Sequence, residues 1–318
     1  VVYQIHTQFT RITGALLPQA YRTFLQWLSV INFDLCWTLP VGCIVDLNFY
    51  QRLLVSTLAP LGVVGLLFMP RASAAVLSRD SFSATLVAQR VKSKATRLAS
   101  ADLQLLLVFT FIIFSGVSTV VFQTFACEEF EATGASFLRA DYSISCRTPE
   151  HKAYIAYAGF MIFVYPIGIP VLYGWVLRRH RTHTAMLHPV PASSPVTHAS
   201  AFLRKAYHQR ADYWECMECI RRISLTGSLV FIAPGTPSQY VAACALSFGA
   251  IVIYELVQPH RLRADTCLYT LGGVITWMTM YLAALTGGPA AAATVEGNAL
   301  SERGAAAGVV LIVLNVLL

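Results

Sequence analysis

The stretch LQLLLVFTFIIFSGVSTVVFQTFAC, residues 103–127, contains no charged side chain over 25 residues. An α-helix needs about 20 largely apolar residues to cross the hydrocarbon core of a bilayer. Because this run is long enough and uncharged, it predicts a membrane-spanning helix. The remainder of the chain must then supply the partners of that helix.

The composition of the chain fits a membrane protein. Of its 318 residues, 56% are hydrophobic and only 12% are charged, whereas water-soluble domains carry roughly 25% charged residues. The net charge of +7 comes from basic residues in short stretches between apolar runs. That pattern is typical of the positive-inside rule, so we expect no nucleic-acid partner. The chain begins in a mixed segment and ends within an apolar run, and we expect a larger parent protein.

Six further segments are predicted to cross the membrane. The uncharged stretch 223–254 is too long for one span and is interrupted by Pro234-Gly235-Thr236-Pro237, so we interpret it as part of a helical hairpin. The fold class that we predict is all-α, a polytopic transmembrane helix bundle with about seven spans. Besides residues 103–127, the spans cover residues 53–70, 153–177, 216–233, 239–257, 267–285 and 305–318.

The first 48 residues are less regular than the rest. Residues 24–45 are largely apolar but contain Asp34 and a proline, and a crossing there would leave a tight turn before the next span. We therefore predict that residues 1–48 form a re-entrant or interfacial segment on the outer side. Residues 49–318 then form one transmembrane helix bundle. The tail of an earlier helix is the alternative interpretation for residues 1–17.

The charges of the connecting segments predict the orientation. Residues 71–102, 178–215 and 259–265 are basic, whereas residues 128–152 hold five acidic and three basic side chains. Lys and Arg are in excess in cytoplasmic loops, and the three basic segments share one side if every span is real. We therefore place these segments in the cytoplasm and residues 128–152 outside.

Four cysteines fall on the predicted outer side. Cys127 and Cys146 flank the one sizeable outer loop, and we predict a disulfide between them because the outer compartment is oxidising. Cys36 and Cys43 are a weaker candidate pair, for which two free, buried thiols are an equal alternative.

The string Cys216-Met217-Glu218-Cys219 has the C-x-x-C spacing of zinc and redox motifs. A zinc site needs two further ligands, and the chain has no second C-x-x-C. We interpret the two cysteines as small residues one turn apart on a helix. We predict no metal site and no cofactor. Hydrolase, nucleotide-binding and metalloprotease motifs are also absent from the sequence, so we expect no catalytic residues and no enzyme.

Three carboxylates lie at predicted membrane depth, where ionisable groups are costly and tend to serve function. Asp34 and Glu255 lie near opposite ends of the bundle and are the candidates for an ion path. Glu218 precedes Arg221 and Arg222 by three and four residues, which favours a local ion pair. A structural role is the alternative for each carboxylate.

A proline-rich string interrupts the span at residues 153–177. Pro166 and Pro170 flank Gly168 in the sequence PIGIP. Proline removes a backbone hydrogen bond and kinks a helix. We predict a bend here, with Pro166, Gly168 and Pro170 as a gating hinge; a permanent packing kink is the alternative.

Four strings together resemble one group of proteins. They are FDLCWTLPVGCIVDLNFYQRLLVSTLAP at 33–60, FLRADYSISC at 137–146, YAGFMIFVYPIGIPVLYGWVLRRHR at 157–181 and DYWECMECIRRISLTG at 212–227. They resemble the multi-pass C-terminal region of transient-receptor-potential-like (TRP C-terminal-domain) surface proteins of algae and protists. The resemblance covers roughly residues 20–260, and its motifs are moderately specific.

This resemblance implies a channel-like membrane module at the C-terminal end of a large surface protein, in a plasma or ciliary membrane. We expect membrane lipids, a large extracellular region or assembly, and a homo- or hetero-oligomer with other membrane proteins as partners. If the protein conducts, we expect cations, because the outer loop is net acidic and concentrates them. A non-conducting membrane anchor for an extracellular assembly is the main alternative, and a seven-helix receptor is a third.

Overall fold

The computed structural model is mostly helical, with one small β-sheet that the sequence did not lead us to expect. It describes residues 4–6, 8–9, 19–28, 48–77, 86–130, 134–186, 195–232, 236–286, 309 and 312–313.

Within these described residues, five helical segments are long and apolar enough to cross a membrane. They match five of the predicted spans, and they are consistent with an integral membrane protein. The segments are α5 (Phe49–Leu77), α6 (Leu86–Gln123), the run of α7 (Pro149–Ile162), η3 (Phe163–Ile167) and α8 (Gly168–Met186), then α11 (Pro237–Val257) and α12 (Arg263–Thr286).

Residues 216–233, which we predicted as a span, are not among these five. They fall on α10 (Trp214–Thr226) and the 3₁₀ turn η5 (Ser228–Phe231). α10 has 13 residues and carries four charged side chains, so it is shorter and more polar than a typical span. The last predicted span, 305–318, lies almost entirely outside the described residues. The number of about seven spans is therefore not confirmed.

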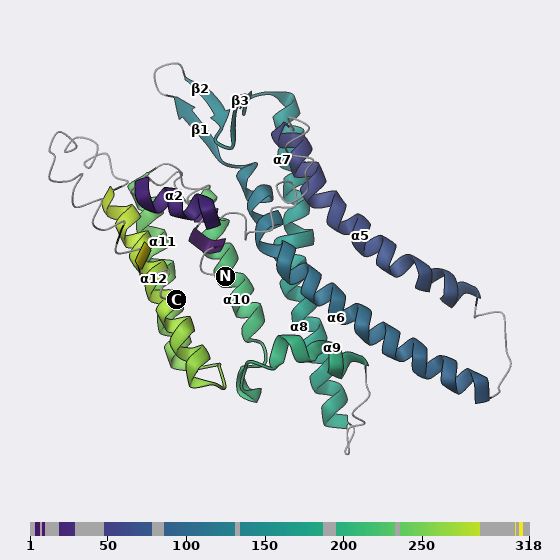
Figure 1. The fold of residues 1–318 in the computed structure, drawn as a ribbon. Coiled ribbons are helices and arrows are strands. Elements are labelled where there is room, and N and C mark those ends of the chain that lie inside the picture. Colours follow the sequence, from purple (N-terminus) through teal and green to yellow (C-terminus); the bar gives the residue numbers. More distant parts are fainter. Residues whose placement is uncertain are drawn as a thin grey trace.

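α10 packs among three of the span-length helical segments. α11 packs against α12, and α10 contacts α11 on one side and α6 and α8 on the other. In Figure 1, α5 and α6 run together away from the rest of the bundle, and the sheet lies at the opposite end from α9 (Pro195–Arg204). The segment 71–102, predicted as a loop, is largely helical, since α5 continues to Leu77 and α6 begins at Leu86.

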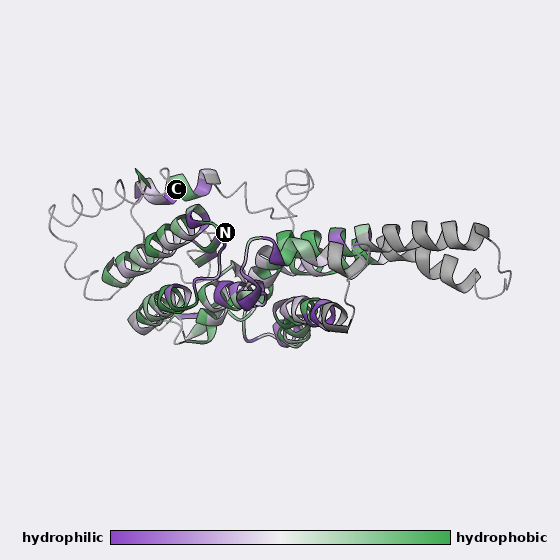
Figure 2. Cartoon of the chain, turned by 90° about the horizontal axis from the view of Figure 1, so that it is seen from below, coloured by the Kyte–Doolittle hydropathy of each residue, from purple (hydrophilic) through white to green (hydrophobic). Residues whose placement is uncertain are grey.

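Large apolar side chains cover the outer faces of the span-length helices. Figure 2 shows apolar residues along the described parts of these helices. In water such a surface would favour association or aggregation, whereas in a bilayer it faces lipid chains of the same polarity. The most exposed examples on these helices are Leu66, Phe160, Phe163, Val171 and Leu256.

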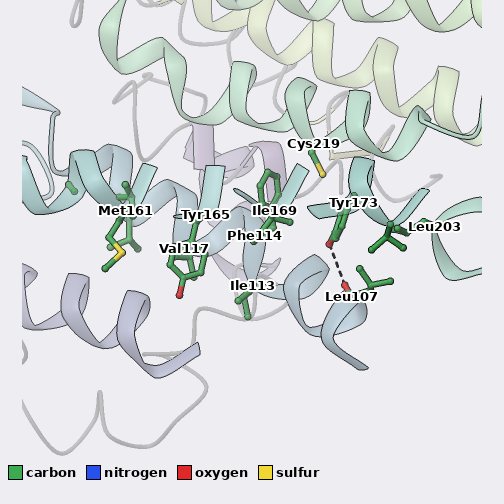
Figure 3. Packing of buried hydrophobic residues seen from close by; sticks show 14 of the residues in the cluster. Leu107, Ile113, Phe114, Val117, Met161, Tyr165, Ile169, Tyr173, Leu203 and Cys219 are labelled. Atoms are coloured by element: carbon green, nitrogen blue, oxygen red, sulfur yellow. Dashed lines mark hydrogen bonds between the residues drawn. The ribbon is translucent and has the colours of Figure 1, made fainter. Parts of the chain in front are cut away.

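The largest apolar core joins α6, the α7–α8 rod and α10. Figure 3 shows Phe114 and Leu107 of α6 beside Tyr173 of α8, with Cys219 of α10 nearby. The Tyr173 hydroxyl donates to the Leu107 carbonyl over 3.3 Å, which satisfies a polar group that is otherwise buried. This core fixes the position of α10 inside the bundle.

The proline-rich string produces a π-helical turn. η3 contains Pro166 and separates α7 from α8, and such turns arise where the regular hydrogen-bond ladder of an α-helix is broken. A Cβ on Gly168 would lie 2.9 Å from the Phe163 carbonyl oxygen, so only glycine fits without a shift. The hydrogen-bond ladder is thus interrupted at the proline string, while the predicted bend and a gating role for Pro166, Gly168 and Pro170 stay predictions.

A three-stranded antiparallel sheet occupies the predicted outer loop. β1 (Cys127–Phe130) pairs with β2 (Ala135–Leu138), and β2 pairs with β3 (Asp141–Ser145). The predicted disulfide joins Cys127 to Cys146, with an S–S distance of 1.97 Å. It ties both ends of the sheet to the start of α7. Cys36 and Cys43 lie outside the described residues.

The described part of residues 1–48 packs on the bundle. α2 (Gln19–Leu28) buries Tyr21 and Leu25 against residues of α10, η5 and α11, and leaves Trp27 exposed. In Figure 1 this helix lies across the end of α11 and α12 that faces the same way as the sheet. The outer-side interfacial or re-entrant placement of residues 1–48, and the boundary at residue 48, stay predictions.

Two of the basic segments meet at the other end of the bundle. His208 N–H donates to the Pro259 carbonyl over 2.8 Å, and Arg261 N–H donates to the Ala206 carbonyl over 3.0 Å. Tyr207 and His260 form an isolated antiparallel bridge between them. The segments at 178–215 and 259–265 therefore share a face, as the charge pattern predicts.

A buried ion-pair network on helix α10

Four charged side chains of α10 lie inside the bundle. Glu218 is 4% exposed and Arg222 is 3% exposed, and Glu215 is buried as well. The spacing explains why they meet, because residues three, four and seven apart lie on one face of a helix. Arg221 completes the set, with a side chain that is 13% exposed. Two carboxylates thus face two guanidinium groups.

Glu218 is the centre of this network. Arg221 donates twice to its carboxylate, over 2.9 and 2.7 Å. Arg222 donates to it over 3.4 Å, and the Tyr269 hydroxyl of α12 donates over 2.7 Å. A two-pronged arginine contact is among the stronger hydrogen-bonded pairs in proteins. The local ion pair that the sequence favours is present, with Tyr269 as an additional partner.

Glu215 extends the network toward the end where the basic segments meet. The Tyr207 hydroxyl donates to Glu215 Oε2 over 2.8 Å, and Arg222 lies 3.8 Å from Glu215 Oε1. Burial, together with the negative charge of Glu215, raises the pKa of Tyr207 far above its usual range. Tyr207 therefore keeps its proton and acts as a donor to the carboxylate.

Aromatic rings enclose the arginines. The Arg221 guanidinium lies 5.3 Å from the centre of the Tyr269 ring, and that of Arg222 lies 4.7 Å from the Phe111 ring. Such cation–π contacts strengthen when water is excluded. Tyr254 stacks on Tyr269 with ring centres 3.9 Å apart. The two charges are thus surrounded by ring faces and carboxylate oxygens.

His260 closes the network at its end. Its Nδ1 shares a hydrogen bond of 2.8 Å with the Tyr254 hydroxyl. Burial lowers the pKa of His260, while Asp265 and Glu218 oppose that shift. A neutral imidazole is therefore favoured at the edge of the network.

A second polar group lies deeper in the bundle. His6 is fully buried, shares a hydrogen bond of 2.8 Å with Tyr21, and lies 3.3 Å from the Thr276 hydroxyl in the middle of α12. His6, Tyr21 and Thr276 thus form a second polar cluster beside the middle of α12.

Another N-terminal residue reaches the middle of α6. The Ser115 hydroxyl donates to the side-chain oxygen of Gln8 over 2.8 Å, and both residues are buried. We use the name polar column for the side chains of this network together with the two N-terminal contacts. All of them are buried except the half-buried Arg221 and Tyr269. The polar column comprises Tyr207, Glu215, Glu218, Arg221, Arg222, Tyr269, His6, Tyr21, Thr276, Gln8 and Ser115.

The two ion-path candidates from the sequence do not belong to the described part of the polar column. Glu255 is exposed on α11, where its carboxylate accepts a hydrogen bond of 2.7 Å from Thr270. Asp34 lies outside the described residues. Sequence reasoning placed Glu218 in a local pair but missed Glu215 and Tyr207. The signal for Glu215 was available, since it precedes Arg222 by seven residues and lies on the same helix face.

Within the described part of the chain, Cys216 and Cys219 belong to no group of side chains with the spacing of metal ligands. Among the described residues, one group has ligand atoms close enough for a metal, namely Cys127, Cys146 and His151. Its two sulfurs are joined in the disulfide and are not thiolates. Cys216 and Cys219 are free thiols, and Cys219 packs in the apolar core, as expected for small residues on a helix.

The fold and the polar column define a class rather than a family: a mostly helical chain with five helices of membrane-spanning length around a buried set of ion pairs. No protein-family model, curated protein or solved structure matches the chain.

Proposed function

We propose that this chain is a channel-like membrane module that conducts cations, as the C-terminal membrane region of a large surface protein. The observation that carries the proposal is the polar column, in which α10 carries three buried charged side chains and the half-buried Arg221 among span-length helices. The sequence resemblance to TRP-like surface proteins points the same way.

The energetic cost of the column distinguishes this proposal from a simple anchor. An anchor needs only apolar surface to resist extraction from the bilayer. Ionisable side chains within a membrane bundle are expensive and usually mark ion or proton pathways. Glu215 and Glu218 provide carboxylates on one helix face, and carboxylates are a common basis of cation selectivity.

The order of the column gives it a direction. Tyr207 and Glu215 lie at the end where basic segments meet, Glu218 follows one turn further, and His6 and Thr276 lie at the depth of the middle of α12. In the proposed module this order leads from the cytoplasmic end toward the middle of the membrane. Other subunits, lipids and an extracellular assembly complete the protein in a plasma or ciliary membrane.

One observation favours a non-conducting anchor as the second candidate. Glu218 accepts from three different side chains, Arg221, Arg222 and Tyr269, which leaves its carboxylate few free lone pairs. A saturated pair of this kind also occurs as a purely structural contact between helices.

Current across a bilayer containing purified protein tests the proposal. Wild type should carry cation current under voltage or tension, and Glu215→Gln should reduce it, because it removes a carboxylate from the column while keeping its shape. Glu255→Gln is the matched control, since that carboxylate is exposed. If folded wild-type protein carries no current, the non-conducting anchor is the better proposal. A third outcome is also possible: Glu255→Gln or Asp34→Asn alters the current and Glu215→Gln does not. In that case the ion path contains Glu255 or Asp34, the candidates from the sequence, rather than Glu215.

A further inference from the structure

An open pocket of about 760 Å³ lies where α11 turns toward α12. Residues 208–211, which precede α10, line one side, and Val257, Gln258 and Arg261 line the other. Gln258 has a left-handed φ of 43° and turns the chain. The backbone bonds between the two basic segments described above hold the sides together, so the pocket is built by the fold.

Positive charge dominates the lining of this pocket. Arg210 and Arg261 contribute exposed guanidinium groups, and His208 adds an exposed imidazole. No ion pair of Arg210 or Arg261 occurs among the residues that the structure describes. Arg261 uses its Nε to bind the Tyr207 carbonyl, which positions the guanidinium but leaves its charge unbalanced.

Carboxylates in the adjoining segments act on other groups. Asp212 interacts electrostatically with Arg204, and Asp265 interacts with His260. Burial lowers the pKa of Arg204, Asp212 opposes this, and repulsion from Arg261 adds to it. The repulsion shows that like charges are crowded here, and an anion would relieve it.

The pocket lies at the boundary of the membrane. The span-length part of α11 ends at Val257, and that of α12 begins at Arg263. Leu256 is 81% exposed and Leu262 is 64% exposed. Basic side chains thus adjoin apolar ones that are suited to lipid chains, which a site for a soluble anion does not need.

We propose that this pocket binds the phosphate headgroup of an anionic membrane phospholipid, with Arg210 and Arg261 as the phosphate-binding residues. The acyl chains of the lipid lie along the exposed leucines beside the pocket. Basic pockets at the ends of transmembrane helices are suited to anionic headgroups, and their pull on an anionic surface is electrostatic. This inference does not depend on whether the protein conducts.

Binding of short-chain phosphatidic acid to the purified full chain tests the proposal. Short-chain phosphatidylcholine tests for charge selectivity, and inorganic phosphate tests for a soluble anion. Wild type should prefer phosphatidic acid to both. Arg210→Gln should weaken that binding about fivefold, the factor that corresponds to roughly 1 kcal/mol for one basic residue at an anionic surface. Arg261→Gln should weaken it at least as much.

Arg178→Gln is the control, because Arg178 is an exposed arginine on α8 outside the pocket. It should bind phosphatidic acid like wild type. Since Arg261 also supports the turn, thermal unfolding of both pocket variants is compared with wild type, and Arg210→Gln decides the outcome. Unchanged binding in a folded Arg210→Gln variant overturns the proposal. Equal binding of phosphatidylcholine, or full competition by inorganic phosphate, overturns it as well.

Discussion

Neutralising Glu218 should destabilise the bundle far more than neutralising an exposed carboxylate. Glu218→Gln keeps the size of the side chain and one carbonyl oxygen but removes the charge that faces Arg221 and Arg222. Arg222 then keeps only Glu215 as an ion-pair partner, at 3.8 Å, and Arg221 keeps none of the ion pairs seen among the described residues. Breaking a buried ion pair by removing one partner costs about 3–5 kcal/mol, because the remaining charge is uncompensated.

The free energy of unfolding of purified protein in lipid–detergent micelles measures this cost. Glu255→Gln is the matched control, since Glu255 is exposed and accepts a hydrogen bond from Thr270; contacts of this exposed kind contribute about 0–1 kcal/mol. A combined Glu218→Gln and Arg221→Gln variant should lose about 1–3 kcal/mol less than the sum of the single losses, because the two residues act as a pair. Equal losses for Glu218→Gln and Glu255→Gln would refute the reasoning that the network is buried and coupled.

Three further predictions concern the disulfide, the π-helical turn and His260. Reducing the disulfide between Cys127 and Cys146 should lower the free energy of unfolding by about 3 kcal/mol, by the loop-entropy estimate. Two additional thiols should then react with maleimide. Equal labelling with and without reductant contradicts the bond. Gly168→Ala should destabilise the protein because its Cβ would meet a backbone carbonyl oxygen. Gly159→Ala should instead be stabilising by roughly 0.5–1 kcal/mol, since a Cβ there has nothing within 4 Å. If Gly168→Ala proved the more stable of the two variants, the turn would relax easily. Burial lowers the pKa of His260 in the folded state, so the unfolded chain binds this proton more readily. The free energy of unfolding should therefore fall as the pH drops below about 6.5 toward the pKa of the folded state. His260→Gln should flatten that part of the curve of stability against pH, and an unchanged curve argues against the assignment.

The span-length helices could be predicted because each depends on a local property. Residues 103–127 have no charge, and a run of that length has few alternatives to a membrane helix. The proline string likewise determined the interruption within the span at 153–177, since the missing hydrogen bonds are a property of Pro166 and Pro170 themselves. The disulfide was also predictable, because its two cysteines flank one loop.

Features that depend on distant contacts were missed. Tyr207 and Tyr269 meet the two carboxylates of α10 only after the chain has folded, and nothing near either tyrosine in the sequence marks this contact. The sheet at residues 127–145 has strands of four or five residues, too short for a clear alternation of polar and apolar positions. The span predicted at 216–233 is not confirmed for a different reason: α10 is short, and its charges are paired with one another.

The contact of His6 with α12 was equally out of reach. A histidine near the start of the chain has no sequence feature that predicts burial beside Thr276. The sequence alone suggested few polar residues within the membrane region, which favoured an anchor. The buried contact of His6 adds such residues and supports the channel proposal.

The most direct test of the polar column as an ion path is an experimental structure of the purified protein in a lipid bilayer, with ordered water resolved and the oligomeric state determined. Our account predicts water or a cation in contact with Glu215 or Glu218, reached from the end where Tyr207 lies, in an oligomer or in an open conformation. A monomer whose column is filled by side chains alone, under conditions that include tension or voltage, would contradict it.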